Sequence, residues 1–309
     1  MEGKVIAVCT SEKRGTEKSN VHQAKFIENF GIENDAHAGN WHRQVSLLSY
    51  DRVLEFNRKG GNAAPGAFGE NLLVEGIDFG CLPVGTVLRC NNVVLKITQI
   101  GKECHSHCAI YKRVGDCIMP REGVFARVIH GGTISVGDTI TVTLPPEDAP
   151  ITAAVVTLSD RCSRGERTDT SGPAAVEILS DAGYEIIETV LIPDEQHLIE
   201  KELIRLSDQR QVNLIVTTGG TGFSERDRTP EATMAVATRN APGIAEAIRY
   251  ESLKITPKAM LGRGSSVIRN RTLIINLPGS EKAVRESLGI VLPTIGHGIK
   301  ILTGGINDF

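Results

Sequence analysis

The chain has 309 residues, of which 40% are hydrophobic and 23% charged, and its formal net charge is −3 at pH 7. This composition excludes a disordered chain, and neither half has more basic than acidic residues, so no nucleic-acid partner is expected. The length favours two domains. The absence of a long apolar run and of a signal peptide predicts a cytoplasmic protein without a membrane partner. Seven cysteines, an odd number, argue against a disulfide framework.

The first half of the sequence predicts short β-strands separated by glycine, proline and asparagine turns. One helix is expected at 50–59, because Gly60 and Gly61 follow its apolar residues. Asn91-Asn92 fits a hairpin turn that needs positive φ. Many strands with few helices to cover them favour a barrel or a sandwich over a doubly wound sheet. The predicted strands are 4–10, 44–49, 71–75, 86–90, 93–99 and 139–143.

Residues 34–44 bring a carboxylate, two histidines, an arginine and the only tryptophan into one short stretch. Two interpretations stay open for it. The stretch is either a binding loop or a polar turn in which His37 and His42 cap backbone groups. Residues 66–76, where glycines lead into a strand, by themselves predict only a turn.

A third stretch, residues 101–120, concentrates cysteine, histidine and basic side chains. The cysteines and histidines of residues 104–108 suggest zinc, but ligands so crowded cannot surround one tetrahedral ion without a second cluster. Basic neighbours would favour a reactive thiolate, and ordinary cysteines at a strand end are the remaining interpretation. The candidates for the reactive thiol, in order of preference, are Cys108, Cys117 and Cys104.

Together these stretches resemble the MOSC family, a β-barrel module named for the C-termini of molybdenum-cofactor sulfurases. The resemblance covers residues 3–144 and depends on Asp35-x-His37-x-Gly39, on Gly69-Glu70-Asn71 and on the cysteine region. It implies that this half binds a pterin molybdenum cofactor. It also implies that one of the three candidate cysteines carries sulfur or contacts the metal.

Proline and acidic residues between 144 and 150 predict a short, semi-rigid linker. The expected division is a β-barrel-like domain at 1–145, a linker at 146–150 and a second domain at 151–309. Beyond the linker the predicted order is β-α-β-α-β, and right-handed crossovers make such sequential strands parallel. This order predicts a three-layer α/β domain with a mostly parallel sheet.

Two helix starts of the second half are predicted from capping residues. Asp169-Thr170-Ser171 offers N-caps for the helix after it, and Thr229 before Pro230 fits an N-cap followed by proline at the first helical position. The predicted elements are strand 153–158, helix 172–182, strand 184–192, helix 196–207, strand 214–218, helices 229–238 and 244–253, and strands 265–269 and 272–277, which pair about Asn270-Arg271.

The stretch Thr217-Thr-Gly-Gly-Thr-Gly222 follows a buried strand and suits a phosphate, because glycines allow close approach and threonines add hydroxyls. It is neither a P-loop nor a dinucleotide fingerprint, so a tight turn without a ligand stays open. Asp227 weighs against that turn, since a carboxylate beside a phosphate needs a divalent cation between them. With Glu225 it suggests a magnesium–nucleotide site.

Four polar segments follow strands of the second half and are expected to meet at the carboxyl edge of the sheet, where open α/β sheets bind ligands. Here the sequence resembles the MogA family, the molybdopterin-binding enzymes of molybdenum-cofactor synthesis. The resemblance depends on 217–222 and 226–232 and extends across most of 151–303. It implies transfer of AMP from ATP to the terminal phosphate of molybdopterin, with release of pyrophosphate, in a homo-oligomer that is commonly a trimer.

The essential acidic positions of that family map onto Asp194 and Asp227, which the resemblance implies are catalytic and hold magnesium. ATP and Mg2+ would serve as co-substrate and metal, molybdopterin as substrate, and other molybdenum-cofactor enzymes as partners. Molybdenum is a further candidate cofactor of the first half. The implied substrate-binding residues are Ser159, Asp160, Ser171, Gly172, Thr218, Gly219, Gly220, Thr221, Gly222, Asn276, Pro278, Gly279 and Ser280. The alternatives are a non-catalytic carrier or sensor of the cofactor and a nucleotide-binding protein of other specificity.

Overall fold

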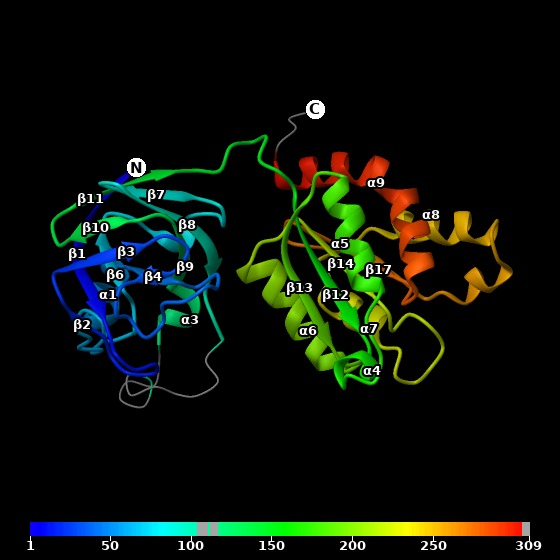
Figure 1. Cartoon of the computed structure of the whole chain (residues 1–309), viewed down its shortest axis with the longest axis horizontal. Helices are drawn as coiled ribbons and strands as arrows, with labels where there is room; N and C mark the ends of the chain where they lie inside the picture. The colour runs from blue at the N-terminus through cyan, green and yellow to red at the C-terminus, as the bar shows by residue number, and fades with distance from the viewer. Residues whose placement is uncertain (104–110, 112–116, 305–309) are drawn as a thin grey trace. The chain divides into compact units, whose positions relative to one another are not determined.

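The structure is a computed structural model that describes residues 1–103, 111 and 117–304. The chain divides into two compact units, Met1–Pro146 and Glu147–Phe309, whose helices and strands are labelled in Figure 1. Within the described residues no helix is both long and apolar enough to cross a membrane. In that part of the chain Cys9, Cys81, Cys90 and Cys162 are free thiols, as expected.

Seven strands of the N-terminal unit close into a barrel. They are β1 (Glu2–Thr10), β5 (Val45–Ser49), β6 (Leu72–Glu75), β7 (Val87–Cys90), β8 (Val93–Ile100), β9 (Val124–His130) and β11 (Thr139–Thr143). The order is β11-β7-β8-β9-β5-β6-β1, and β1 pairs back to β11. Among these seven described strands, only β5 and β6 pair in parallel. Closure leaves these strands without a free edge.

Apolar side chains fill the barrel interior from alternate positions of the strands. Along β8, buried and half-buried residues alternate, as expected of a strand with one face inward. β5 is buried at every position because α1 (Tyr50–Arg58) and α3 (Met119–Glu122) cover its outer face. The predicted helix at 50–59 and the hairpin at Asn91, whose φ is 53°, are confirmed.

The remaining strands of this unit were not predicted. β2 (Ser19–Asn20) pairs with the end of β1, and β10 (Gly132–Ser135), β3 (Gln23–Ile27) and β4 (Gly31–Ile32) form a separate three-stranded sheet. β9 was missed as well, and its first three positions are all buried. A short 3-10 turn, η1 (Phe79–Cys81), completes the unit.

Six strands of the C-terminal unit form a mixed sheet. In spatial order they are β13 (Glu185–Ile192), β12 (Thr152–Leu158), β14 (Leu214–Thr218), β17 (Thr272–Leu277), β16 (Ser266–Arg269) and β15 (Arg239–Asn240). The first four run parallel, whereas β16 and β15 are antiparallel to their neighbours. The prediction of a mostly parallel sheet is thus corrected to a mixed sheet. The predicted hairpin at Asn270, with φ 52°, is what reverses the chain.

Helices cover both faces of this sheet and complete three layers (Figure 1). One face packs against α5 (Ser171–Asp181), α8 (Pro242–Leu253) and α9 (Glu281–Thr303). The other face packs against α6 (Gln196–Ile204), its π-helical continuation η2 (Arg205–Gln209) and α7 (Thr229–Ala235). Neighbouring residues such as Val155 and Val156 enter opposite cores, which is why the parallel strands are apolar throughout. The shorter elements are α4 (Asp160–Ser163) and η3 (Pro257–Leu261).

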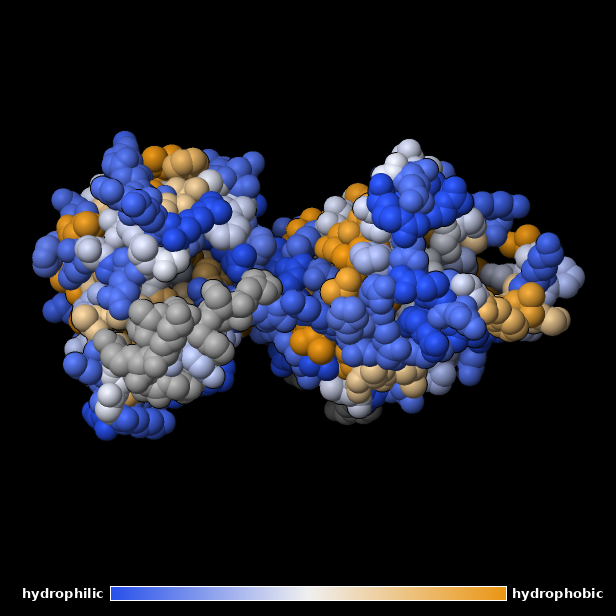
Figure 2. Space-filling view, turned by 90° about the horizontal axis from the view of Figure 1, so that it is seen from below, coloured by the Kyte–Doolittle hydropathy of each residue, from blue (hydrophilic) through white to orange (hydrophobic). Residues whose placement is uncertain are grey.

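The face of the protein drawn in Figure 2 is mostly polar, with apolar side chains scattered in small groups. Large apolar side chains that are exposed on the C-terminal unit include Phe223, Tyr250 and Met260. Single exposed apolar residues of this kind are normal on a folded protein. Of the three, Phe223 lies on the loop after β14.

Candidate functional site

The ends of β12 and β13 are joined by two aspartates. The amide of Asp160 donates to Asp194 Oδ2 at 2.9 Å, and the amide of Asp194 donates to Asp160 Oδ1 at 3.1 Å. Ser159, predicted to lie in a loop, instead caps the short helix α4 by accepting from the Cys162 amide. These reciprocal bonds hold both carboxylates at the carboxyl edge of the parallel strands.

The loop after β14 requires glycine at two positions. A Cβ at Gly219, where φ is +102°, would lie 2.3 Å from the carbonyl oxygen of Leu158. A Cβ at Gly220, where φ is +61°, would lie 2.2 Å from the Thr229 hydroxyl and 3.0 Å from Asp194 Oδ1. The loop backbone therefore lies directly against Asp194, with no room for a side chain between them.

Thr229 does not cap α7 as predicted. The helix begins at Thr229 itself, and the threonine hydroxyl donates to the carbonyl of Gly219 at 3.0 Å. Its side chain is buried against the glycine loop, where the hydroxyl donates to a carbonyl instead of accepting from an amide of the helix. The residue thus fastens the start of α7 to the loop.

Asp194 keeps one carboxylate oxygen without a hydrogen-bond partner. Its Oδ1 is buried and unpaired, while Oδ2 holds the Asp160 amide. Burial raises the pKa of Asp194, and the nearby charges of Asp160 and Asp227 raise it further. A buried, unpaired carboxylate oxygen beside a phosphate-type loop is a position that a cation would satisfy.

Asp227 lies on the far part of the loop, which Arg263 clamps. Its Oδ2 accepts from the Ser224 amide at 2.9 Å and would lie 2.9 Å from a Cβ at Gly222. Arg263 donates to the Gly222 carbonyl at 2.7 Å, to the Asp227 carbonyl and to the Glu231 carboxylate. The sequence analysis missed Arg263 because it lies far along the chain, and only tertiary structure brings it to the loop.

Asp169 organises the other side of the site and supplies the side-chain bonds to the start of α5 that Thr170, the N-cap residue, does not make. Its Oδ1 accepts from the amides of Ser171 and Gly172 at 2.9 and 3.0 Å, and its Oδ2 accepts from Thr157 at 2.7 Å. Burial alone would raise the pKa of Asp169, but these hydrogen bonds lower it. The start of α5 is thereby bound to the sheet.

Two threonine hydroxyls of β14 are already engaged within the protein. Thr218 lies 2.9 Å from the Ser171 hydroxyl, and Thr217 accepts from the Asn276 amide at 2.9 Å. Asn276 also donates to Thr233 and accepts from Ser265, so its buried side chain joins β17 to α7 and to the segment before β16. The side chains of Thr217, Thr218 and Asn276 therefore stabilise the strands and helices around the site through hydrogen bonds to one another and to their neighbours.

The turn after β17 also reaches the loop. A Cβ at Gly279 would lie 3.1 Å from the Gly219 Cα, and Ser280 caps α9 by accepting from the Ala283 amide. Thr221 is buried, and its carbonyl accepts from the Arg263 amide. The structure therefore brings together the four strand ends that the sequence predicted to converge, with Pro278 in the last of them.

Two hollows lie on this unit. One, of about 330 Å³, adjoins the loop and is lined by Phe223, Ser224, Glu225, Asp227, Arg228, Glu231 and Arg263. The other, of about 420 Å³, is lined by Ile151, Ala182, Tyr184, Leu292, Gly296, His297 and Lys300. The larger hollow contains neither an acidic pair nor a glycine loop. We therefore place the candidate site at the smaller hollow and the carboxylates beside it.

A magnesium ion fits this site on the chemistry of its donors. Among the described residues no group of three or more histidine, cysteine, aspartate or glutamate side chains could hold a metal. Mg2+ does not need one, because it usually binds one or two protein carboxylates together with substrate phosphates and water. Asp194 and Asp227 would be those carboxylates, and the unpaired Asp194 Oδ1 is the oxygen open to the ion.

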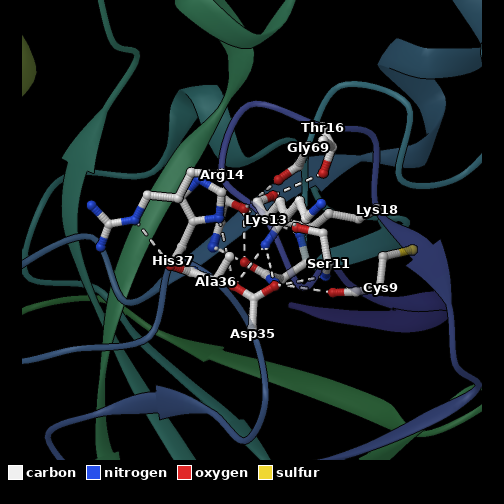
Figure 3. Close-up of polar contacts among 12 residues, drawn as sticks. Cys9, Ser11, Lys13, Arg14, Thr16, Lys18, Asp35, Ala36, His37 and Gly69 are labelled. Atoms are coloured by element: carbon white, nitrogen blue, oxygen red, sulfur yellow. Dashed lines mark hydrogen bonds and ion pairs between the residues drawn. The ribbon is translucent and has the colours of Figure 1, made fainter.

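The N-terminal unit holds a different cluster, centred on Lys18 and Asp35 (Figure 3). Lys18 Nζ lies 2.6 Å from Asp35 Oδ1, and both side chains are 0% exposed. Asp35 also accepts from the amides of Ser11 and His37. Burial would raise the pKa of Asp35, but bonds from His37, Lys18 and Ser11 hold it well below its usual range. Asp35 of the predicted motif thus joins three segments of the barrel.

The candidate cysteines are only partly described. Cys104 and Cys108 lie outside the described residues, and Cys117 is buried in the cluster that packs on α1. Cys81 lies exposed in η1. A hydrogen bond to Asp78 raises the pKa of Cys81, which disfavours its thiolate.

Each of the two units matches a known protein family. Residues 154–297 match the family model "Probable molybdopterin binding domain", and residues 34–141 match the MOSC domain. A molybdopterin adenylyltransferase of Helicobacter pylori is 46% identical over 152 residues, which are 48% of this chain and 86% of that protein. The chain belongs to the molybdopterin adenylyltransferase family. It is a fusion of an N-terminal MOSC domain with a C-terminal domain of the MogA type.

A second curated relative and a solved structure are also similar to this chain. The Escherichia coli K12 enzyme of that name is also 46% identical over 152 residues, which are 47% of this chain and 77% of the enzyme. A crystal structure titled molybdopterin biosynthesis enzyme MoaB, from a Thermus species, is 45% identical. It covers 50% of this chain and 97% of its own, with a TM-score of 0.48.

Proposed function

We propose that the C-terminal unit transfers AMP from ATP to the terminal phosphate of molybdopterin. A phosphate oxygen of the pterin attacks the α-phosphorus of ATP, the new P–O bond forms, and the bond to the β-phosphate bridge breaks to release pyrophosphate. The observation that carries this proposal is the unpaired Asp194 Oδ1 held against the glycine loop. The names of the relatives support the choice of substrates.

The residues of the site would bring two anionic substrates together. Backbone amides of the loop after β14 would bind phosphate oxygens, because glycine leaves them uncovered. Asp194 and Asp227 would hold Mg2+, which supplies positive charge to offset the repulsion between the phosphates. Arg263 would keep the loop in one shape by fixing the carbonyls of Gly222 and Asp227.

The test is to incubate the full chain with molybdopterin, ATP and magnesium. The expected products are adenylylated pterin, detected by mass spectrometry, and one pyrophosphate for each pterin converted. A chain that binds the pterin and leaves it unchanged would instead be a carrier. A chain that consumes ATP without modifying the pterin would have another specificity.

For the N-terminal unit we propose binding of a pterin molybdenum cofactor, with a cysteine that carries sulfur or contacts the metal. The support is the MOSC match and the basic residues around the candidate cysteines in the sequence. We expect Cys108 to be alkylated first near neutral pH. Burial raises the pKa of Cys9 to about 12 and that of Cys90 to about 11, so these thiols should react slowly.

Mass-spectrometric mapping of alkylated peptides tests this order of reactivity. Cys108→Ser should lose any persulfide or bound molybdenum, and Cys9→Ser is the control that should not. Labelling of Cys104 or Cys117 before Cys108 would move the assignment to that residue. If all three are inert and their serine variants bind cofactor normally, the unit is better regarded as a docking barrel.

A further inference from the structure

The Arg226 side chain connects three strand ends of the candidate site. It lies on the loop after β14, next to Asp227. Its Nε and Nη2 donate to both oxygens of Asp160 at 3.0 and 2.8 Å, and its Nη1 donates to Glu195 at 2.8 Å. Asp160 follows β12, and Glu195 lies just after β13. The guanidinium thus fastens the loop to the ends of two neighbouring strands.

The contacts of Arg226 lie at the candidate site, where an anionic substrate would bind. Arg226 lies against Asp160, whose backbone amide donates to Asp194 beside the glycine loop. The guanidinium donates to both oxygens of Asp160, so its positive charge offsets the charge of that carboxylate. As long as this pair exists, both oxygens of Asp160 are engaged in hydrogen bonds to the protein.

We call the contacts from Arg226 to Asp160 and Glu195 the arginine latch. These contacts are easily broken. The Arg226 side chain is 51% exposed, and Glu195 is 41% exposed, so solvent weakens both ion pairs. Glu195 precedes α6 without capping it by a side-chain hydrogen bond, so loosening this contact leaves the helix start intact. A guanidinium binds phosphate in the same two-pronged geometry as carboxylate, and phosphate brings more charge.

We propose that Arg226 exchanges its carboxylate partners for the phosphates of ATP when magnesium and the nucleotide bind. This inference rests on the proposed function, because it names the residue that recognises the triphosphate at that same site. In the ligand-free protein Arg226 pairs with Asp160 and Glu195 and holds the loop in place. Once it turns to the nucleotide, Asp160 Oδ2 loses the bond from Arg226 and becomes available to the cation beside Asp194, while Oδ1 keeps the Asp194 amide.

The exchange predicts opposite effects for the two partners of one ion pair. Arg226→Gln should weaken binding of Mg·ATP by at least about tenfold, since charge-assisted bonds to phosphate are lost. Glu195→Gln should strengthen it by about two- to fivefold, because a competitor for the arginine is removed. If Arg226 only supported the loop, both substitutions would weaken binding.

Calorimetric titration of the full chain with Mg·ATP measures these affinities. The gain from Glu195→Gln should disappear when Arg226→Gln is also present, which separates partner exchange from a general loss of negative charge. Arg164→Gln is the matched control, because Arg164 makes a similar two-pronged pair with Glu166 at 2.7 and 3.1 Å and is comparably exposed. It should leave the affinity within about twofold.

Hydrogen exchange of residues 223–228 gives a second readout that does not depend on activity. Arg226→Gln should speed exchange there in the ligand-free protein, and Mg·ATP should protect the wild-type loop but not the variant. Unchanged Mg·ATP affinity in Arg226→Gln, or weaker binding in Glu195→Gln, would overturn the inference. Both outcomes would leave the proposed function standing if the wild type still makes adenylylated pterin. A wild type that neither binds Mg·ATP nor adenylylates the pterin would overturn both.

Discussion

Each unit joins distant segments with one cation and a carboxylate, but in opposite surroundings. In the barrel, Lys18 and Asp35 are sealed from solvent, and Asp35 binds the amides of Ser11 and His37 as well. In the C-terminal unit, Arg226 meets Asp160 while half of its own side chain stays in solvent. A buried pair is costly to break and serves as a fixed joint, whereas an exposed pair contributes little stability and can exchange partners.

The fixed joint predicts the largest effect on stability. Lys18→Met should lower the free energy of unfolding of the N-terminal unit by about 3–5 kcal/mol, because Asp35 is left as an uncompensated buried charge. Thermal or denaturant unfolding measures the loss, and replacing Asp35 with Leu in the same variant should recover part of it. Lys25→Met is the control, since Lys25 pairs with Glu33 on the surface. Equal losses for both lysine variants would contradict a sealed joint.

Substitutions at the candidate site of the C-terminal unit should lower activity without unfolding the protein. Asp227→Asn and Asp194→Asn should each reduce AMP transfer by at least about a hundredfold, because a carboxylate that holds magnesium contributes several kcal/mol to charge stabilisation. Pterin binding and the unfolding midpoint should change little. Asp181→Asn, at the end of α5, is the control. Wild-type turnover by the Asp227 variant would end its assignment as a metal ligand.

Glu70 should make the stability of the barrel depend on pH. It lies buried near Lys18 and accepts from the amides of Gly66 and Phe68. Burial raises the pKa of Glu70 to about 7 from 4.5. Between these values the unfolded chain releases a proton that the folded barrel keeps. The contribution of Glu70 to stability should therefore be greatest below pH 4.5 and fall by about 3 kcal/mol as the pH rises to 7.

Unfolding measured from about pH 4 to pH 8 should show this slope in the wild type and a flatter curve in Glu70→Gln. Glu75→Gln, an exposed change on β6, should keep the wild-type slope. Identical slopes in the wild type and in Glu70→Gln would show that Glu70 does not titrate in this range.

The smallest expected effect is on the stability of the C-terminal unit. Arg226→Gln should leave its unfolding midpoint unchanged, because the arginine is exposed and its ion pairs are screened by solvent. Differential scanning calorimetry with the Arg164→Gln variant beside it measures this. A clear drop in the midpoint for Arg226→Gln alone would show that the arginine latch is a fixed joint after all.

Local patterns allowed much of the fold to be predicted from the sequence. Asn91 and Asn270 predicted two hairpins because asparagine tolerates positive φ, and the structure has both. The apolar run at 214–218 predicted a strand buried on both faces, which β14 is. Prediction failed where strands are only two residues long, as in β2 and β4, and where a buried hydroxyl found a tertiary acceptor, as Thr229 did at Gly219.

The sequence by itself determined two units of different architecture, the glycine loop and the acidic residues around it, because these depend on periodicity, turn chemistry and motifs read along the chain. Tertiary structure alone decided which carboxylate oxygen is left unpaired, that Arg263 clamps the loop and that Arg226 joins Asp160 to Glu195. Arg226 and Asp160 are 66 positions apart. Pairing over such a separation is set by how the strands are ordered in the sheet, and no local pattern encodes it.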